Sequence, residues 1–171
     1  MILPTISLWQ PWASLIAIGA KRFETRAYRP PDKYIGQRIA IHAAARQCRD
    51  NLMDVDGRVY WEIASTLFGE GVPPGELPPT EWERLPHGKV VCTAVLAGAY
   101  RCGGCGRRGQ VAVSRLGAFG FESPTSIAID AFGDYSPGRW AWLLTDVQPL
   151  DPPVPAKGKQ GWWMWDDGSD P

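Results

Sequence analysis

Apolar and polar residues alternate along several short stretches of the chain, which is the pattern of strands with one buried face. In the stretch 34–43, for example, Ile39 and Ile41 alternate with smaller or more polar residues. The stretch 89–100 is rich in valine and small side chains, which suit a curved sheet. Strands are expected at 5–8, 22–28, 34–43, 89–100 and 139–147, with a last one ending at Trp165.

Helical spacing occurs in two other stretches. Pro11 suits a first helical position, and Trp12, Leu15 and Ile16 recur on one face before Gly19 ends the pattern. A second helix is expected from about residue 46, with an apolar face made of Leu52, Val55, Val59, Ile63 and Leu67. Five or six strands with two helices predict an α+β fold, a small β-barrel with flanking helices.

The remaining stretches predict loops within a single domain spanning residues 1–171. Residues 69–88 form a Pro/Gly-rich surface excursion, with a helical turn expected at 80–85. Residues 101–137 are expected to be a glycine-rich loop insertion, and 166–171 a frayed acidic tail.

Composition restricts the kind of partner. Eighteen basic and eighteen acidic residues leave no net charge, which argues against a non-specific polyanion binder but allows a local basic pocket.

No stretch approaches the roughly 20 apolar residues of a membrane helix, and the first residues lack the pattern of a signal peptide. The four cysteines do not form a disulfide pattern, so a cytoplasmic protein with reduced thiols is expected.

The run from Gly19 to Arg26 concentrates charged residues beside aromatic ones. In a regular strand, Glu24 and Arg26 share one face, Thr25 points to the other, and Lys21 in the preceding turn can reach the Glu24 face. A carboxylate next to two cations can read a nucleobase amine and hold phosphate or carbonyl oxygen. With burial, Lys21 and Glu24 can also carry out acid–base catalysis. The alternative is a solvated ion-pair cluster.

Aromatic and amide side chains near this run are candidates for base binding. Trp9 and Tyr28 can stack a base, whereas Trp12 begins an apolar helix face and is expected in the core. Gln10 can contact a base edge or cap the helix, and both alternatives stay open. His42 is a candidate proton shuttle, with a structural, hydrogen-bonded histidine as the alternative.

A separate candidate is metal binding at Cys102 and Cys105, whose spacing is that of half a zinc site. A full site would need Cys48, Cys92 or a histidine as further ligands. Apart from this structural zinc, no cofactor is expected. The neighbouring arginines also allow a nucleic-acid contact without a metal.

Four motifs together resemble the ASCH domain family of PUA-like barrels: Leu8-Trp9-Gln10-Pro11-Trp12-Ala13, Gly19-x-Lys21-x-x-Glu24-x-Arg26, Gly138-Arg139-Trp140-Ala141-Trp142 and Gln160-Gly161-Trp162. The resemblance implies a β-barrel with a cleft lined by the Lys21 motif beside the first helix, with Arg139 and Gln160 at its rim. It implies binding of RNA or a modified nucleoside.

The same resemblance implies two enzymatic alternatives, in which Lys21, Glu24 and His42 are the candidate catalytic residues. One is an amidohydrolase of N4-acylated cytidine, and the other is a ribonuclease acting on single-stranded RNA. The family's amidohydrolases place a threonine nucleophile where Glu24 stands here. A third alternative is a protein-interaction module that uses the cysteine loop. No membrane partner is expected.

Overall fold

The computed structural model describes residues 1–46, 57–69, 79–105, 110–116 and 122–168. The fold is α+β, with a mixed sheet in which hydrogen-bonded strands follow the order β2-β7-β4-β3-β1-β8, and β5 and β6 extend from β4. Within the described residues this order ends at β2 on one side and β8 on the other. Closure into a barrel therefore stays a prediction.

The chain divides into two compact units. The first unit holds Met1–Ala20, Arg38–Ala94 and Val147–Pro171, and the second holds Lys21–Gln37 and Val95–Asp146. Strands β4 (Lys89–Cys105) and β7 (Trp140–Pro155) each contribute residues to both units. The expected single domain of residues 1–171 stays a prediction.

In the first unit, β1 (Ile2–Leu8) lies between two partners. It pairs in parallel with β3 (Arg38–Ala43) and antiparallel with β8 (Trp162–Asp166). Leu3 of β1 and Trp165 of β8 enter the core with Ala40 and Val90. All three strands were expected, but β1 and β3 are buried on both faces and not on one alone.

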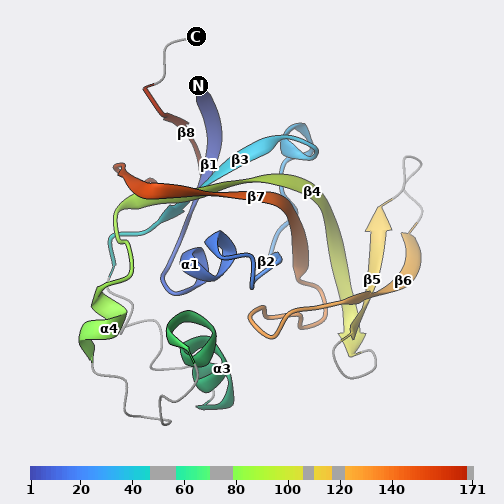
Figure 1. The fold of residues 1–171 in the computed structure, drawn as a ribbon. Helices are drawn as coiled ribbons and strands as arrows, with labels where there is room; N and C mark the ends of the chain where they lie inside the picture. The colour runs from blue at the N-terminus through green and yellow to red at the C-terminus, as the bar shows by residue number, and fades with distance from the viewer. Residues whose placement is uncertain (47–56, 70–78, 106–109, 117–121, 169–171) are drawn as a thin grey trace. The chain divides into compact units, whose positions relative to one another are not determined.

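Helix α1 (Trp12–Ala17) buries Ala13, Ser14, Leu15 and Ile16. The chain leaves the helix through Gly19, whose φ of +78° is favourable only for glycine, so the predicted stop is confirmed. Trp12 begins this helix as predicted, but the structure leaves it only half-buried. Helix α1 contacts β3 and the longer helix α3 (Gly57–Phe68), as Figure 1 shows.

The second predicted helix is confirmed over α3, whose described part includes Ile63 in the core. Leu52 and Val55, the earlier part of its expected apolar face, lie outside the described residues. The helical turn predicted at 80–85 is present as α4 (Pro79–Glu83), whose Trp82 donates from Nε1 to Tyr60 Oη at 3.0 Å.

In the second unit, β2 (Phe23–Arg26) pairs antiparallel with β7, and a short helical turn, η1 (Asp32–Tyr34), follows β2. The prediction of a loop insertion at 101–137 is wrong over about half of its length, which is in strands. Strand β4 continues to Cys105 and pairs antiparallel with β5 (Gln110–Leu116), which pairs in turn with β6 (Glu122–Ala128). The glycines that suggested a loop lie at the end of β4 and outside β5 and β6, neither of which contains a glycine.

Strand β7 is also longer than the predicted 139–147, since it continues to Pro155 through several prolines. Proline lacks a backbone donor, which made this stretch look like a loop. Asp146, with a φ of +46°, marks the position at which β7 leaves the second unit for the first.

Candidate functional site

The charged residues of the Lys21 motif meet at β2 in the second unit. Glu24 lies opposite Trp142 of β7, and Arg26 lies opposite Trp140, so both side chains are on one face of this strand pair. Arg26 Nε is 2.8 Å from Glu24 Oε1. Thr25 has the opposite parity, and its Oγ1 accepts from the backbone N–H of Asp134 at 3.1 Å. The faces predicted from strand parity are confirmed.

Lys21 is almost fully buried, at 2% exposure, and its amine reaches the Glu24 face as predicted. Its Nζ donates to Phe23 O at 2.6 Å and Phe132 O at 3.1 Å, and lies 3.9 Å from Glu24 Oε2. Burial lowers the pKa of Lys21, while the Glu24 and Asp130 carboxylates oppose this shift. The Glu24 side chain is only 9% exposed, so the alternative of a solvated ion-pair cluster does not fit.

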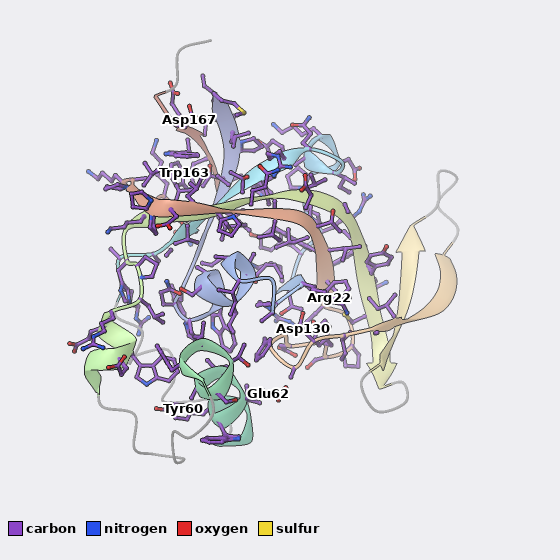
Figure 2. All side chains as sticks on the ribbon, in the orientation of Figure 1. Arg22, Tyr60, Glu62, Asp130, Trp163 and Asp167 are labelled. Carbon is purple, nitrogen blue, oxygen red and sulfur yellow. The ribbon has the colours of Figure 1, made fainter. Side chains whose placement is uncertain are left out.

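Asp130 fixes the backbone at the start of β2. Its Oδ2 accepts from the N–H groups of Arg22 at 2.8 Å and Phe23 at 3.1 Å, and its Oδ1 accepts from Phe132 N–H at 3.0 Å. Arg22 and Asp130 face one another in Figure 2. Sequence reasoning missed this residue, because its partners lie 107 and 108 positions away and no local pattern marks them.

Arg139 and Tyr28, two further predicted residues, belong to the same unit. Arg139 Nε lies 3.1 Å from Asp134 Oδ2, and its Nη2 donates to Thr25 O at 3.2 Å. The pKa of Asp134 is lowered chiefly by the hydrogen bond from Ser136 Oγ, with Arg139 adding to the effect. Tyr28 is 48% exposed and its ring packs edge-on against Trp142, with centroids 5.6 Å apart.

The predicted residues Trp9 and Gln160 belong to the first unit. Trp9 is 50% exposed, and the Arg46 guanidinium lies over its ring, 4.7 Å from the centroid. Gln160 is exposed, between β7 and β8. A joint site of these residues with Lys21, Glu24 and Arg26 stays a prediction.

Gln10 is fully buried in the first unit and serves the helix. Its Oε1 accepts from Ser14 N–H at 3.1 Å, and its Nε2 donates to Pro86 O at 2.7 Å. Of the two alternatives left open by the sequence, these contacts favour capping over contact with a base edge.

His42 is buried in the first unit and forms hydrogen bonds through both ring nitrogens. Nε2 lies 3.1 Å from Ala156 O and Nδ1 lies 3.1 Å from Ser7 Oγ. A carbonyl oxygen only accepts, so Nε2 carries a proton and donates it to Ala156 O. Trp163, labelled in Figure 2, packs edge-on against the imidazole and donates from Nε1 to Ser7 Oγ at 3.2 Å. These contacts favour the structural alternative for His42.

The cysteine motif shows no metal site in the part of the chain that the structure describes. Cys102 is buried in β4, and burial raises the pKa of its thiol. Among the described side chains, no three His, Cys, Asp or Glu residues converge as metal ligands. The Cys105 side chain lies outside that description, so zinc binding stays a prediction. No helix among the described residues is long and apolar enough to span a membrane.

Comparison with known proteins identifies the family. The ASCH domain model matches residues 6–101, which include β2 and the Lys21 motif. The crystal structure of ASCH from Zymomonas mobilis is similar at 18% identity and a TM-score of 0.40, covering 89% of this chain and 72% of that one. Two mutant forms of that protein match with the same identity, TM-score and coverage of this chain, at 72% and 74% of their own length. No curated protein matches. Since the family model matches more than half of the 171 residues, the chain belongs to the ASCH domain family.

Proposed function

We propose that this protein binds RNA through the Lys21, Glu24 and Arg26 side chains of the second unit. The ASCH domain family is associated with RNA binding. In the proposed complex, Glu24 accepts a hydrogen bond from the exocyclic amine of a nucleobase. Lys21 and Arg26 hold a carbonyl or phosphate oxygen next to that amine.

The observation that carries this proposal is the burial of three charged groups in one cluster. Lys21 and Glu24 are buried, and Arg26 is half-buried with its Nε 2.8 Å from Glu24. Removing an ion from water costs several kcal/mol, and well-packed apolar side chains often stabilise a fold at least as well. A cluster that is a poor source of stability is better explained by recognition of a ligand.

The unequal contacts of the Glu24 carboxylate explain how it can take a new donor. Oε1 is 2.8 Å from Arg26, whereas Oε2 and the Lys21 amine are 3.9 Å apart, beyond hydrogen-bond distance. A carboxylate has about four lone-pair positions, so a base amine can be added without breaking the Arg26 contact.

The test replaces both buried ions at once, as Lys21→Met with Glu24→Gln. This pair keeps the side-chain volumes close to the originals and leaves the net charge unchanged. Binding of a labelled single-stranded RNA hexamer is followed by fluorescence anisotropy, and the double variant is expected to bind at least about tenfold more weakly, since each hydrogen bond to a charged group contributes about 1.5–3 kcal/mol.

The matched control is Glu81→Gln with Arg84→Gln, which removes an exposed ion pair of 2.6 Å in and just after α4. It is expected to bind RNA as the parent does. Equal RNA affinity of the Lys21/Glu24 variant and the parent, with both folded by circular dichroism, contradicts the proposal.

The second candidate function is hydrolysis, favoured by one observation: burial lowers the pKa of Lys21, and a lowered pKa makes an amine a better proton-transfer group. Thr25 lies on the face opposite Glu24, so the nucleophile would be water that loses a proton to Glu24. For N4-acetylcytidine, water oxygen attacks the acetyl carbon, the C–N bond breaks, and cytidine leaves after its nitrogen gains a proton.

Incubation with N4-acetylcytidine, and separately with single-stranded RNA, tests this candidate by chromatography of the products. Turnover that is abolished in Glu24→Gln supports hydrolysis. Absence of turnover by the parent, with RNA binding intact, leaves binding as the function.

A further inference from the structure

Beyond Glu24 and Arg26, the same face of β2 and β7 continues into aromatic side chains. Trp142 and Trp140 lie opposite Glu24 and Arg26 in the strand register, so they point to this face. Tyr28 packs on Trp142, and the Arg29 guanidinium lies 5.9 Å from the ring centroid of Trp140. We call this group of residues the Tyr28 platform: Arg26, Tyr28, Arg29, Trp140 and Trp142.

Tyr28 has the properties of a rigid stacking surface. Nearly half of the residue is exposed, while the Trp142 side chain beneath it is fully buried. Trp142 also donates from Nε1 to Tyr28 O at 3.2 Å, so it holds both the ring and the backbone of Tyr28. A tyrosine fixed in this way gives up little side-chain entropy when a base stacks on it.

The charges around the platform suit a phosphate backbone. Residues 21–33 contain five lysines and arginines against one glutamate and one aspartate, although the whole chain has a net charge of zero. Two of these cations belong to the platform: Arg26 pairs with Glu24, and Arg29 Nη2 lies 2.6 Å from Asp32 Oδ1. Asp32 is 71% exposed, so a phosphate can replace it at Arg29 at little cost.

We propose that the Tyr28 platform binds a second nucleotide of a single-stranded nucleic acid, whose base stacks on Tyr28 and whose phosphate contacts Arg26 and Arg29. This inference rests on the proposed function, because it takes the first base to be at Glu24. The ligand is then a strand of at least two nucleotides rather than a free nucleoside. Every base has a π face, so the platform tolerates any sequence and either sugar.

The first experiment compares ligands of different length. Cytidine monophosphate and hexamers of oligo(rC) and oligo(dC) compete with a labelled hexamer in anisotropy titrations. The parent is expected to bind the hexamers at least about tenfold more tightly than the monophosphate, because stacking on an aromatic side chain and a second phosphate contact are added. Comparison of the oligo(rC) and oligo(dC) hexamers shows whether the nucleotide bound at Glu24 is preferred with ribose or with deoxyribose. Equal affinity for monophosphate and hexamers overturns the proposal.

Substitutions at the platform separate stacking from folding. Tyr28→Leu keeps an apolar contact with Trp142 but removes the aromatic face, and should lower the hexamer-to-monophosphate affinity ratio about tenfold. Tyr28→Phe is expected to keep the ratio. The control Tyr34→Leu removes a half-buried tyrosine of η1 in the same unit and should also keep it. A ratio unchanged in Tyr28→Leu overturns the proposal.

Salt dependence tests the phosphate contact. Arg29→Gln should reduce the slope of log affinity against log salt by about 0.7, the value for one phosphate on a single strand. Asp32→Asn removes the competing carboxylate and should tighten hexamer binding. An unchanged slope in Arg29→Gln overturns the role of Arg29.

The failures of the two proposals are distinguishable. If the Lys21/Glu24 variant binds RNA as the parent does while Tyr28→Leu loses the length dependence, the Glu24 base site is wrong and the platform binds alone. If the Lys21/Glu24 variant loses binding and Tyr28→Leu changes nothing, the platform is wrong and the Glu24 site stands. A parent that binds no nucleic acid overturns both.

Discussion

The imidazole of His42 contacts the Ser7 hydroxyl group on one side and the Ala156 carbonyl on the other, and the backbone at Gly158 lies close to it. An added Cβ on Gly158 would lie 2.3 Å from His42 Cε1 and 2.6 Å from Nδ1. Ser7 pairs with His42 across β1 and β3, and its Oγ donates to Lys159 O at 3.0 Å. One polar pair therefore fixes the segment between β7 and β8 against β1 and β3.

Gly158→Ala tests this close approach. The methyl group cannot be accommodated without moving the imidazole, so the free energy of unfolding is expected to fall by about 1–3 kcal/mol in urea titrations. Gly98→Ala is the matched control, because its Cβ would meet Tyr100 at an ordinary 3.6 Å. Equal stability of Gly158→Ala and the parent contradicts the packing around His42.

His42 also makes the free energy of unfolding depend on pH. Burial lowers its pKa below the value of about 6.5 found in unfolded chains, so the unfolded state takes up the proton first. The contribution of the neutral ring to stability is complete above about pH 6.5 and is lost as the pH falls from there through the folded pKa. In urea titrations at pH 7.5, 6.5 and 5.5, the free energy of unfolding should change less with pH in His42→Gln than in the parent. The same change of unfolding free energy with pH in both proteins contradicts the stabilisation by a buried, neutral His42.

At the scale of secondary-structure elements, β2 shows what local sequence can and cannot predict. Alternation placed Glu24 and Arg26 on one face and Thr25 on the other, because strand parity is a local property. Asp130, which accepts hydrogen bonds from the backbone N–H groups of Arg22 and Phe23, lies in a distant segment, so no local spacing in the sequence indicates these contacts. The strands β5 and β6 were missed for a related reason. Neither contains a glycine, but both lie in a glycine-rich stretch, and their pairing with each other and with β4 is not a local property of the sequence.

Asp130→Asn tests how far this distant residue stabilises β2. An amide can keep one acceptor but has no second oxygen for the remaining N–H groups, so a loss of about 1.5–3 kcal/mol in unfolding free energy is expected. Asp32→Asn, which alters an exposed ion pair, should cost less than about 1 kcal/mol. If Asp130→Asn costs no more than that control, Asp130 does not stabilise β2.

At the scale of the whole molecule, the two compact units are joined by two continuous strands. Each of β4 and β7 begins in one unit and ends in the other, and whether the two units unfold as a single cooperative domain is open to experiment. The buried thiols of Cys92 in the first unit and Cys102 in the second lie on the same strand and report on the two units separately.

Thiol labelling in increasing urea, resolved by peptide mass spectrometry, measures whether both units open together. One domain predicts the same midpoint for Cys92 and Cys102, because two-state unfolding exposes all buried groups in one transition. Burial raises the pKa of Cys92 to about 12, so labelling of the folded state should be negligible at pH 8. Separated midpoints would show two domains instead.

The contacts of Lys21 carry a consequence for selectivity under the proposed function. The Lys21 amine donates to Phe23 O and Phe132 O, and the Glu24 carboxylate lies 3.9 Å from it. A ligand oxygen that binds the Lys21 amine therefore competes with these partners. The contact with Glu24, at 3.9 Å, is the weakest of the three and is the first to be replaced. A bare anion would take the Lys21 contact from that carboxylate and leave it with Arg26. A ligand with a donor beside its acceptor, such as the amine and carbonyl edge of cytosine, would compensate both groups and be selected over inorganic phosphate.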